Sequence, residues 1–162
     1  MRYLVTFALA AALGVGAAAW AHGPGDHASK AKRPLSGEET TFGREGDPKK
    51  VTRTIKVDMN DRMRFDPAEL TVKRGEVVRF EVKNSGRTMH EMVLGTMKDL
   101  KEHAELMRKH PGMEHDEPYM AHVAPGKTER MVWQFTKAGQ FYYACLVSGH
   151  FEAGMMGKIT VR

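Results

Sequence analysis

The chain has 162 residues, of which 41% are hydrophobic, enough for one ordinary domain with its own apolar core. Its formal net charge of +5 favours docking to an acidic partner, but no basic stretch interleaved with aromatic residues indicates a nucleic-acid surface. The single cysteine excludes an intramolecular disulfide.

The first 21 residues have the anatomy of an export signal. Arg2 provides a positive start, an apolar stretch follows, and Ala19-Trp20-Ala21 fits an A-x-A cleavage site. The apolar stretch is barely long enough to span a bilayer, which makes a membrane anchor the weaker interpretation. We therefore expect a signal peptide cleaved after Ala21, an exported protein free of the membrane, and no nucleic-acid partner.

The next segment, residues 22–50, is rich in glycine, proline and charge and nearly free of large apolar residues. Such a segment buries too little apolar surface to offset the entropy lost on ordering. We therefore expect a disordered tail, which contains two of the histidines of the chain, and a folded domain over residues 51–162.

From residue 51 on, apolar residues alternate with polar ones, which indicates β-strands. The alternating segments are short, and turn-forming residues separate several of them. They lie at residues 55–57, 70–72, 78–82, 90–94, 131–135, 141–145 and 159–161. This pattern predicts an all-β sandwich.

One segment breaks the alternation. Residues 97–110 are good helix formers, and a Pro-Gly pair follows them. The apolar stripe of this helix contains Leu100, Ala104 and Met107, which could pack on the sandwich. A polar loop then leads back to the sheet, so we expect a short helical insertion over residues 97–127.

The run CLVSGHFEAGMMGKITV at residues 145–161 carries Cys145, His150 and Met155. A thiolate and a thioether are soft ligands and an imidazole is borderline, a mixture that suits copper. A set of two histidines and one cysteine with a long axial methionine is the blue-copper arrangement. This set needs one more histidine from elsewhere in the chain, and His90 lies on the inward face of its strand just as Cys145 does.

Two separated motifs resemble those of the cupredoxin family. The ending HFEAGMMGKITV is similar to the plastocyanin-type pattern His-x₃-Gly-Met-x-Gly-Lys, and the Cys-x₄-His-x₄-Met spacing is similar to that of rusticyanin. Upstream, an asparagine precedes a histidine in Asn84-Ser-Gly-Arg-Thr-Met-His90, as before the first copper ligand of cupredoxins. The resemblance covers residues 51–162.

The resemblance implies a cupredoxin Greek-key β-sandwich that binds one type 1 copper. His90, Cys145 and His150 would be the strong ligands and Met155 the weak axial one. Met156 is the competing axial candidate, and the Gly-Met-x-Gly match favours Met155.

The resemblance also implies two residues around the ligands. Asn84 would fix the ligand loops by hydrogen bonds, as groups that surround metal ligands commonly do. Glu91 follows the first histidine where many family members carry Asn or Ser. Because Glu91 falls on the outward face of its strand, we expect its charge to face solvent.

Further histidines and methionines could bind additional copper, since imidazoles and thioethers suit both copper oxidation states. The alternative is that the histidines are solvated and that the helix methionine packs against the sandwich. Both interpretations stay open here. The candidates are His22, His27, His103, Met107, His110, Met113, His115, Met120 and His122.

The four-ligand site would be closed, which argues against an enzyme because catalytic metals keep an open position. The export signal, the histidine-bearing tail and the Met/His-rich insertion resemble periplasmic copper-tolerance cupredoxins of the CopI kind. This resemblance implies a periplasmic, redox-active, monomeric protein that serves copper tolerance. The alternative is a soluble one-electron carrier whose redox partner docks transiently near His150, against an apolar rim of Leu146, Phe151 and Met156.

Overall fold

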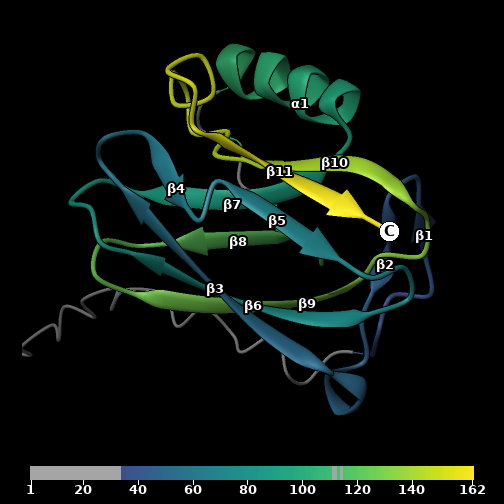
Figure 1. Cartoon of the computed structure of the whole chain (residues 1–162). Coiled ribbons are helices and arrows are strands. Elements are labelled where there is room, and N and C mark those ends of the chain that lie inside the picture. The colour runs from purple at the N-terminus through teal and green to yellow at the C-terminus, as the bar shows by residue number, and fades with distance from the viewer. Residues whose placement is uncertain (1–33, 111–112, 114) are drawn as a thin grey trace, which may run out of the picture. The chain divides into compact units, whose positions relative to one another are not determined.

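Two β-sheets packed face to face form the domain in the computed structural model, which describes residues 34–110, 113 and 115–162 (Figure 1). In these residues the first sheet has six strands, in the order β1-β2-β9-β6-β3-β4, and the second has five, in the order β5-β11-β10-β7-β8. The strands are β1 (Glu39–Thr40), β2 (Gly43–Glu45), β3 (Arg53–Asn60), β4 (Arg64–Asp66), β5 (Glu69–Val72), β6 (Val77–Asn84), β7 (His90–Gly95), β8 (Met120–Val123), β9 (Thr128–Gln134), β10 (Gly139–Ala144) and β11 (Met156–Val161).

The chain crosses repeatedly between the two sheets. After β4 it leaves the first sheet, forms β5 in the second, and returns as β6, which runs parallel to β3. In the second sheet β5 likewise runs parallel to β11. Parallel neighbours require such crossover connections, so each sheet is tied to the other by the chain itself. The predicted all-β sandwich is confirmed.

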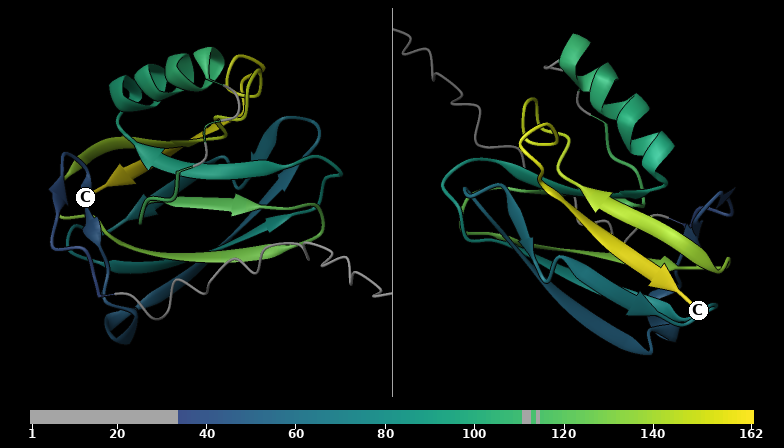
Figure 2. Two further views of the ribbon diagram at one scale, coloured as in Figure 1. Left: turned by 180° about the vertical axis from the view of Figure 1, so that it is seen from behind. Right: turned by 45° about the horizontal axis from the view of Figure 1, so that its top comes forward.

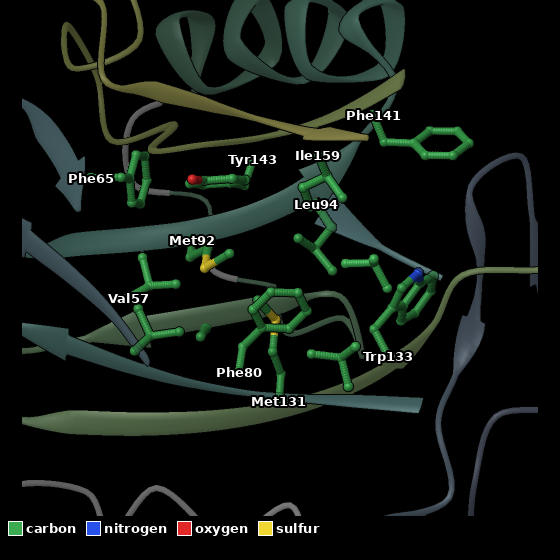
Figure 3. Close-up of a cluster of buried hydrophobic side chains, with 14 of the residues drawn as sticks. Val57, Phe65, Phe80, Met92, Leu94, Met131, Trp133, Phe141, Tyr143 and Ile159 are labelled. Atoms are coloured by element: carbon green, nitrogen blue, oxygen red, sulfur yellow. The ribbon is translucent and has the colours of Figure 1, made fainter. Parts of the chain in front are cut away.

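The core lies between the sheets, where side chains of both point toward one another (Figure 3). Strand β6 illustrates the local rule, because successive side chains of a strand alternate between its two faces. Val78, Phe80 and Val82 are fully buried, whereas Arg79 and Glu81 on the other face remain partly exposed. The alternation seen in the sequence is therefore the alternation between core and surface.

Residues 34–50 differ from the expected disordered tail. Strands β1 and β2 extend the first sheet, β2 pairs with β9, and a 3₁₀ turn follows at Pro48–Lys50. Phe42 is only 4% exposed, and its ring stacks on that of Trp133 with centroids 5.1 Å apart. At Gly43 a side chain would strike the carbonyl oxygen of Gln134. One aromatic anchor and a free sheet edge thus order a segment whose average composition is polar.

Residues 1–33 lie outside the described residues. The expected signal peptide and the candidate ligands His22 and His27 therefore stay predictions. No helix in the described ranges is long and apolar enough to cross a bilayer.

The insertion forms helix α1 (Met97–Lys109) and covers the outer face of the second sheet (Figures 1 and 2). A capping box begins the helix: the Thr96 hydroxyl accepts from the backbone N–H of Asp99, and the Asp99 carboxylate accepts from the backbone N–H of Thr96. Leu100 and Ala104 are buried against β7 and β10. The predicted helical insertion is confirmed, and it closes the second sheet from outside.

The segment that follows the helix is not a loop throughout. Met120 begins β8, which pairs with β7 and becomes the edge strand of the second sheet. Its four residues are too few for the alternation to stand out from a polar loop. The side chain of Met120 is buried, and Met107 packs against the same apolar cluster beneath α1. For these two methionines packing, and not an exposed ligand position, is what the structure supports.

We predict that Phe42→Ala lowers the free energy of unfolding by about 3 kcal/mol, because it removes a buried ring and leaves a cavity beside Trp133. Urea denaturation followed by tryptophan fluorescence measures the change. Leu35→Ala is the control, since Leu35 is 48% exposed and should contribute little. Equal, small effects of the two substitutions would mean that residues 34–50 do not belong to the cooperative fold.

Candidate metal centre

Three potential metal ligands meet at the end of the sandwich core. The Sγ of Cys145 lies 3.2 Å from Nδ1 of His150 and 3.9 Å from Nδ1 of His90. The ligand atoms of all three lie within 4.8 Å of one another, and both imidazoles present the same nitrogen to the sulfur. His90 begins β7 and Cys145 directly follows β10, so two of the three are carried by paired strands.

The ligand loop after β10 is closed by its own backbone. The N–H of Cys145 donates to the carbonyl of Met155 at 3.1 Å, and the N–H of Met155 donates to the carbonyl of His150 at 3.0 Å. A further bond joins the N–H of His150 to the carbonyl of Val147 at 2.9 Å. These bonds hold Cys145, His150 and Met155 in one tight loop before any metal is bound.

The thiol of Cys145 is buried, and this burial raises its pKa to about 12. The backbone N–H of Glu91 points at the sulfur from 3.4 Å and partly opposes that rise. Near neutral pH the metal-free protein therefore holds a protonated thiol. A metal ion that binds here must displace this proton, because the thiolate is the ligand.

The two adjacent methionines lie in different surroundings. Met155 is fully buried and belongs to the main core cluster, which also contains Cys145. Met156 packs instead against the second apolar cluster, beneath α1. Of the two thioethers, that of Met155 therefore lies on the same face of the second sheet as Cys145. The second glycine of the Gly-Met-x-Gly motif, Gly157, is required for packing, because a side chain there would strike the ring of Tyr143.

Asn84 clamps the loop that precedes His90. Its side-chain N–H groups donate to the carbonyls of Thr88 and Val123, each at 2.8 Å, and its carbonyl oxygen accepts from the N–H of Gly86 at 2.8 Å. The side chain is completely buried. Asn84 thus fixes the position of His90 relative to β8, the kind of support that we expected from this residue.

Glu91 does not face solvent as expected. Its side chain is buried, with the residue 3% exposed; Oε1 accepts from the backbone N–H of Leu146 at 2.9 Å and Oε2 lies 2.9 Å from Nδ1 of His122. The hydrogen bond from His122 to Glu91 raises the pKa of that imidazole, which favours an ion pair. The expectation failed because α1 covers the outer face of β7, so all six residues of this strand are buried.

Asp61, a residue that the sequence did not single out, contacts the far side of His90. Its Oδ1 lies 3.2 Å from Nε2 of His90 and accepts from the Thr88 hydroxyl at 3.0 Å. Hydrogen bonding lowers the pKa of Asp61 to about 2, with the backbone N–H of Arg87 as the largest cause. An ionised carboxylate keeps the proton of His90 on Nε2 and leaves Nδ1 free for a metal.

The remaining candidate ligands that lie within the described residues divide into three groups. His103 and His115 approach each other, with their Nε2 atoms 2.9 Å apart, and His122 bonds to the backbone carbonyl of His115. His110 and Met113 are exposed. Met107 and Met120 pack in the apolar cluster between α1 and the second sheet.

A sandwich that gathers two histidines, a cysteine and a methionine at one end defines a cupredoxin, and comparisons with known proteins agree. The family of copper binding proteins described as the plastocyanin/azurin family matches residues 51–162. The chain belongs to this family. The donor set fits the ion, because thiolate, imidazole and thioether are ligands that copper favours.

Three curated relatives carry the name copper-resistant cuproprotein CopI. The protein of Rubrivivax gelatinosus is 56% identical over 124 residues, which cover 76% of this chain and 75% of that protein. The protein of Pseudomonas aeruginosa is 33% identical in an alignment that covers 83% of this chain and 89% of that protein. The chain is therefore a copper-binding cupredoxin related to the copper-resistance protein CopI.

Solved structures agree on the fold. Auracyanin B superposes with a TM-score of 0.60 at 21% identity, covering 75% of this chain and 96% of that chain. Auracyanin A, a "blue" copper protein from Chloroflexus aurantiacus, gives a TM-score of 0.58 at 24% identity, covering 67% of this chain and 98% of that chain. At these identities the likeness establishes the cupredoxin sandwich alone.

We predict that Asp61→Asn raises the reduction potential of the copper-loaded protein. The carboxylate makes His90 a stronger donor and so favours Cu(II); losing it should weaken Cu(II) binding about tenfold, which corresponds to about 60 mV for one electron. Redox titration of the visible absorption measures the shift. Glu152→Gln is the control, because Glu152 carries the same charge in the ligand loop but is exposed. Equal shifts in both variants would mean that Asp61 acts only through its charge and not through its contact with His90.

Proposed function

We propose that the protein binds one copper ion at a type 1 site formed by His90, Cys145, His150 and Met155, and that it serves copper tolerance in the periplasm. The observation that carries the proposal is the convergence of three ligand atoms within 4.8 Å at one end of the sandwich. The names of the curated relatives support the tolerance role, and the signal peptide predicted from the sequence supports the location.

The residues of this chain supply a prearranged ligand set in which His90, Cys145 and Met155 are buried and His150 is partly exposed. Copper supplies one-electron cycling between Cu(I) and Cu(II) when bound. Strand pairing, the closed ligand loop and the Asn84 clamp keep the ligand positions fixed, so a change of oxidation state requires little rearrangement. With all four ligands bound, the copper ion would have no position for a substrate, which argues for a binding and redox role over catalysis.

The one-electron carrier remains the second candidate, and the partial exposure of His150 favours it, because electrons can leave through an exposed ligand edge. The three residues predicted to form an apolar docking rim are less accessible than expected. Leu146 is buried, and Phe151 and Met156 pack against the cluster beneath α1. Met89, which is 44% exposed beside His90, is the apolar side chain that a transient partner could contact.

We predict that the Cu(II) protein shows strong visible absorption from thiolate-to-copper charge transfer and that Cys145→Ser abolishes it. The serine oxygen cannot provide this transition, although it keeps the shape of the side chain. Absorption spectroscopy of copper-loaded protein is the measurement. A wild-type protein that binds copper at this site but stays colourless would contradict the type 1 assignment.

The same substitution tests the biological role. A strain that lacks the gene should regain growth at raised copper when it expresses the wild-type protein, and should not regain it with Cys145→Ser. Normal growth of the deletion strain in copper, combined with defective respiration, would favour the electron carrier.

We predict that Met155→Leu raises the reduction potential while copper stays bound, because the axial thioether is a weak ligand that tunes the potential. Met156→Leu is the matched control, one residue away and on the opposite side of the sheet, and should leave the potential unchanged. Redox titration and metal analysis of both variants measure the effects. The opposite result, a shift only in Met156→Leu, would transfer the axial role to Met156.

A further inference from the structure

A pair of histidines outside the proposed type 1 site faces a surface pocket. His103 of α1 and His115 of the segment before β8 place their Nε2 atoms 2.9 Å apart, with ring centroids 4.7 Å apart and the rings tilted by 36°. Both side chains are half-buried. They line a pocket of about 760 Å³ beside α1, together with the exposed carboxylates of Glu38, Glu102 and Glu117.

Two imidazoles in this arrangement form a ready pair of metal ligands. Without a metal, one Nε2–H must donate to the other Nε2. To bind one metal ion through both Nε2 atoms, the donating ring would take the tautomer with its single proton on Nδ1, so that both Nε2 lone pairs are free for the ion. Burial and the neighbouring His115 lower the pKa of His103, so that this ring is neutral near pH 7. Neutral imidazole is the form that binds metals.

The separation of the two nitrogens indicates which geometry fits. With metal–nitrogen bonds of about 2.0 Å, two ligands at a right angle lie about 2.8 Å apart, whereas opposite ligands lie about 4 Å apart. The observed 2.9 Å is a hydrogen-bond distance, and it is short enough for the two nitrogens to become adjacent ligands of one ion. Tetragonal sites with nitrogen and oxygen ligands are typical of Cu(II), and the carboxylates that line the pocket can supply the oxygens.

We propose that His103 and His115 form a second, solvent-accessible Cu(II) site in this pocket. The site goes beyond the proposed function and does not depend on it, because it shares no ligand with His90, Cys145 or His150. It is joined to the Cys145 region by hydrogen bonds: His122 bonds to the carbonyl of His115, and its other ring nitrogen pairs with Glu91.

The test uses the full mature chain with Cys145→Ser, which removes the type 1 thiolate. Bound Cu(II) is counted by metal analysis after dialysis against a weak chelator, and its ligands are examined by electron paramagnetic resonance. His103→Gln and His115→Gln are the test substitutions, because glutamine can still hydrogen-bond to the remaining imidazole but is a poor copper ligand. His110→Gln is the control, an exposed histidine at the end of the same helix.

We expect each test substitution to lower the count by one Cu(II) per chain and to remove a tetragonal signal with nitrogen splitting. The double substitution should lose no more than either single one, because both rings hold the same ion. Copper bound elsewhere, including any at His22 and His27, is present in parent and variant alike, so it does not affect the difference between their Cu(II) counts. Unchanged counts in both test variants, or an equal loss in His110→Gln, would overturn the proposal.

Circular dichroism of each variant shows whether it is folded. If a glutamine variant does not fold, His103→Asn or His115→Asn takes its place, because asparagine can also hydrogen-bond and is a poor copper ligand. An unchanged Cu(II) count in the folded asparagine variant would refute the site.

Discussion

The arrangement of the proposed metal centre depends on the hydrogen bonds made by Glu91, whose carboxylate is buried. Its two oxygens hold the backbone N–H of Leu146 and the imidazole of His122, while its own N–H points at the sulfur of Cys145. A buried charge is unfavourable unless it is paired and hydrogen-bonded. Strands β7 and β8 and the loop after β10 must therefore keep their relative positions, and these are the elements that surround the proposed thiolate ligand.

The helical insertion creates the burial that gives Glu91 this role. An outward-facing glutamate on a sandwich strand normally lies in water and constrains nothing. Here α1 covers that face, packing Leu100 and Ala104 over β7 and β10, and the carboxylate must find partners within the protein. One of these partners, His122, belongs to the insertion itself. The insertion is thus part of the support of the metal centre and not a surface addition.

Local sequence patterns correctly predicted those structural features that are determined by residues close together in the chain. Strand alternation predicted the sandwich, because core and surface alternate along each strand, and the short spacing from Cys145 to Met155 indicated one ligand loop. Contacts between distant segments had no such signal. Asp61 reaches His90 from 29 positions away through a turn after β3, and Phe42 orders its segment through a single stacked ring. Glu91 was misjudged because its surroundings come from a helix that the strand pattern does not describe.

The difference in accessibility between the two proposed sites bears on the choice between tolerance and electron transfer. A largely buried ligand set such as His90, Cys145 and His150 suits an ion that stays bound while electrons pass through the partly exposed His150. The His103–His115 pair lies in an open pocket among carboxylates, which suits an ion that arrives from solution. An electron carrier needs only the first kind of site. A protein that intercepts excess copper gains from both, and the hydrogen bonds through His122 and Glu91 give the outer site a structural connection to the inner one.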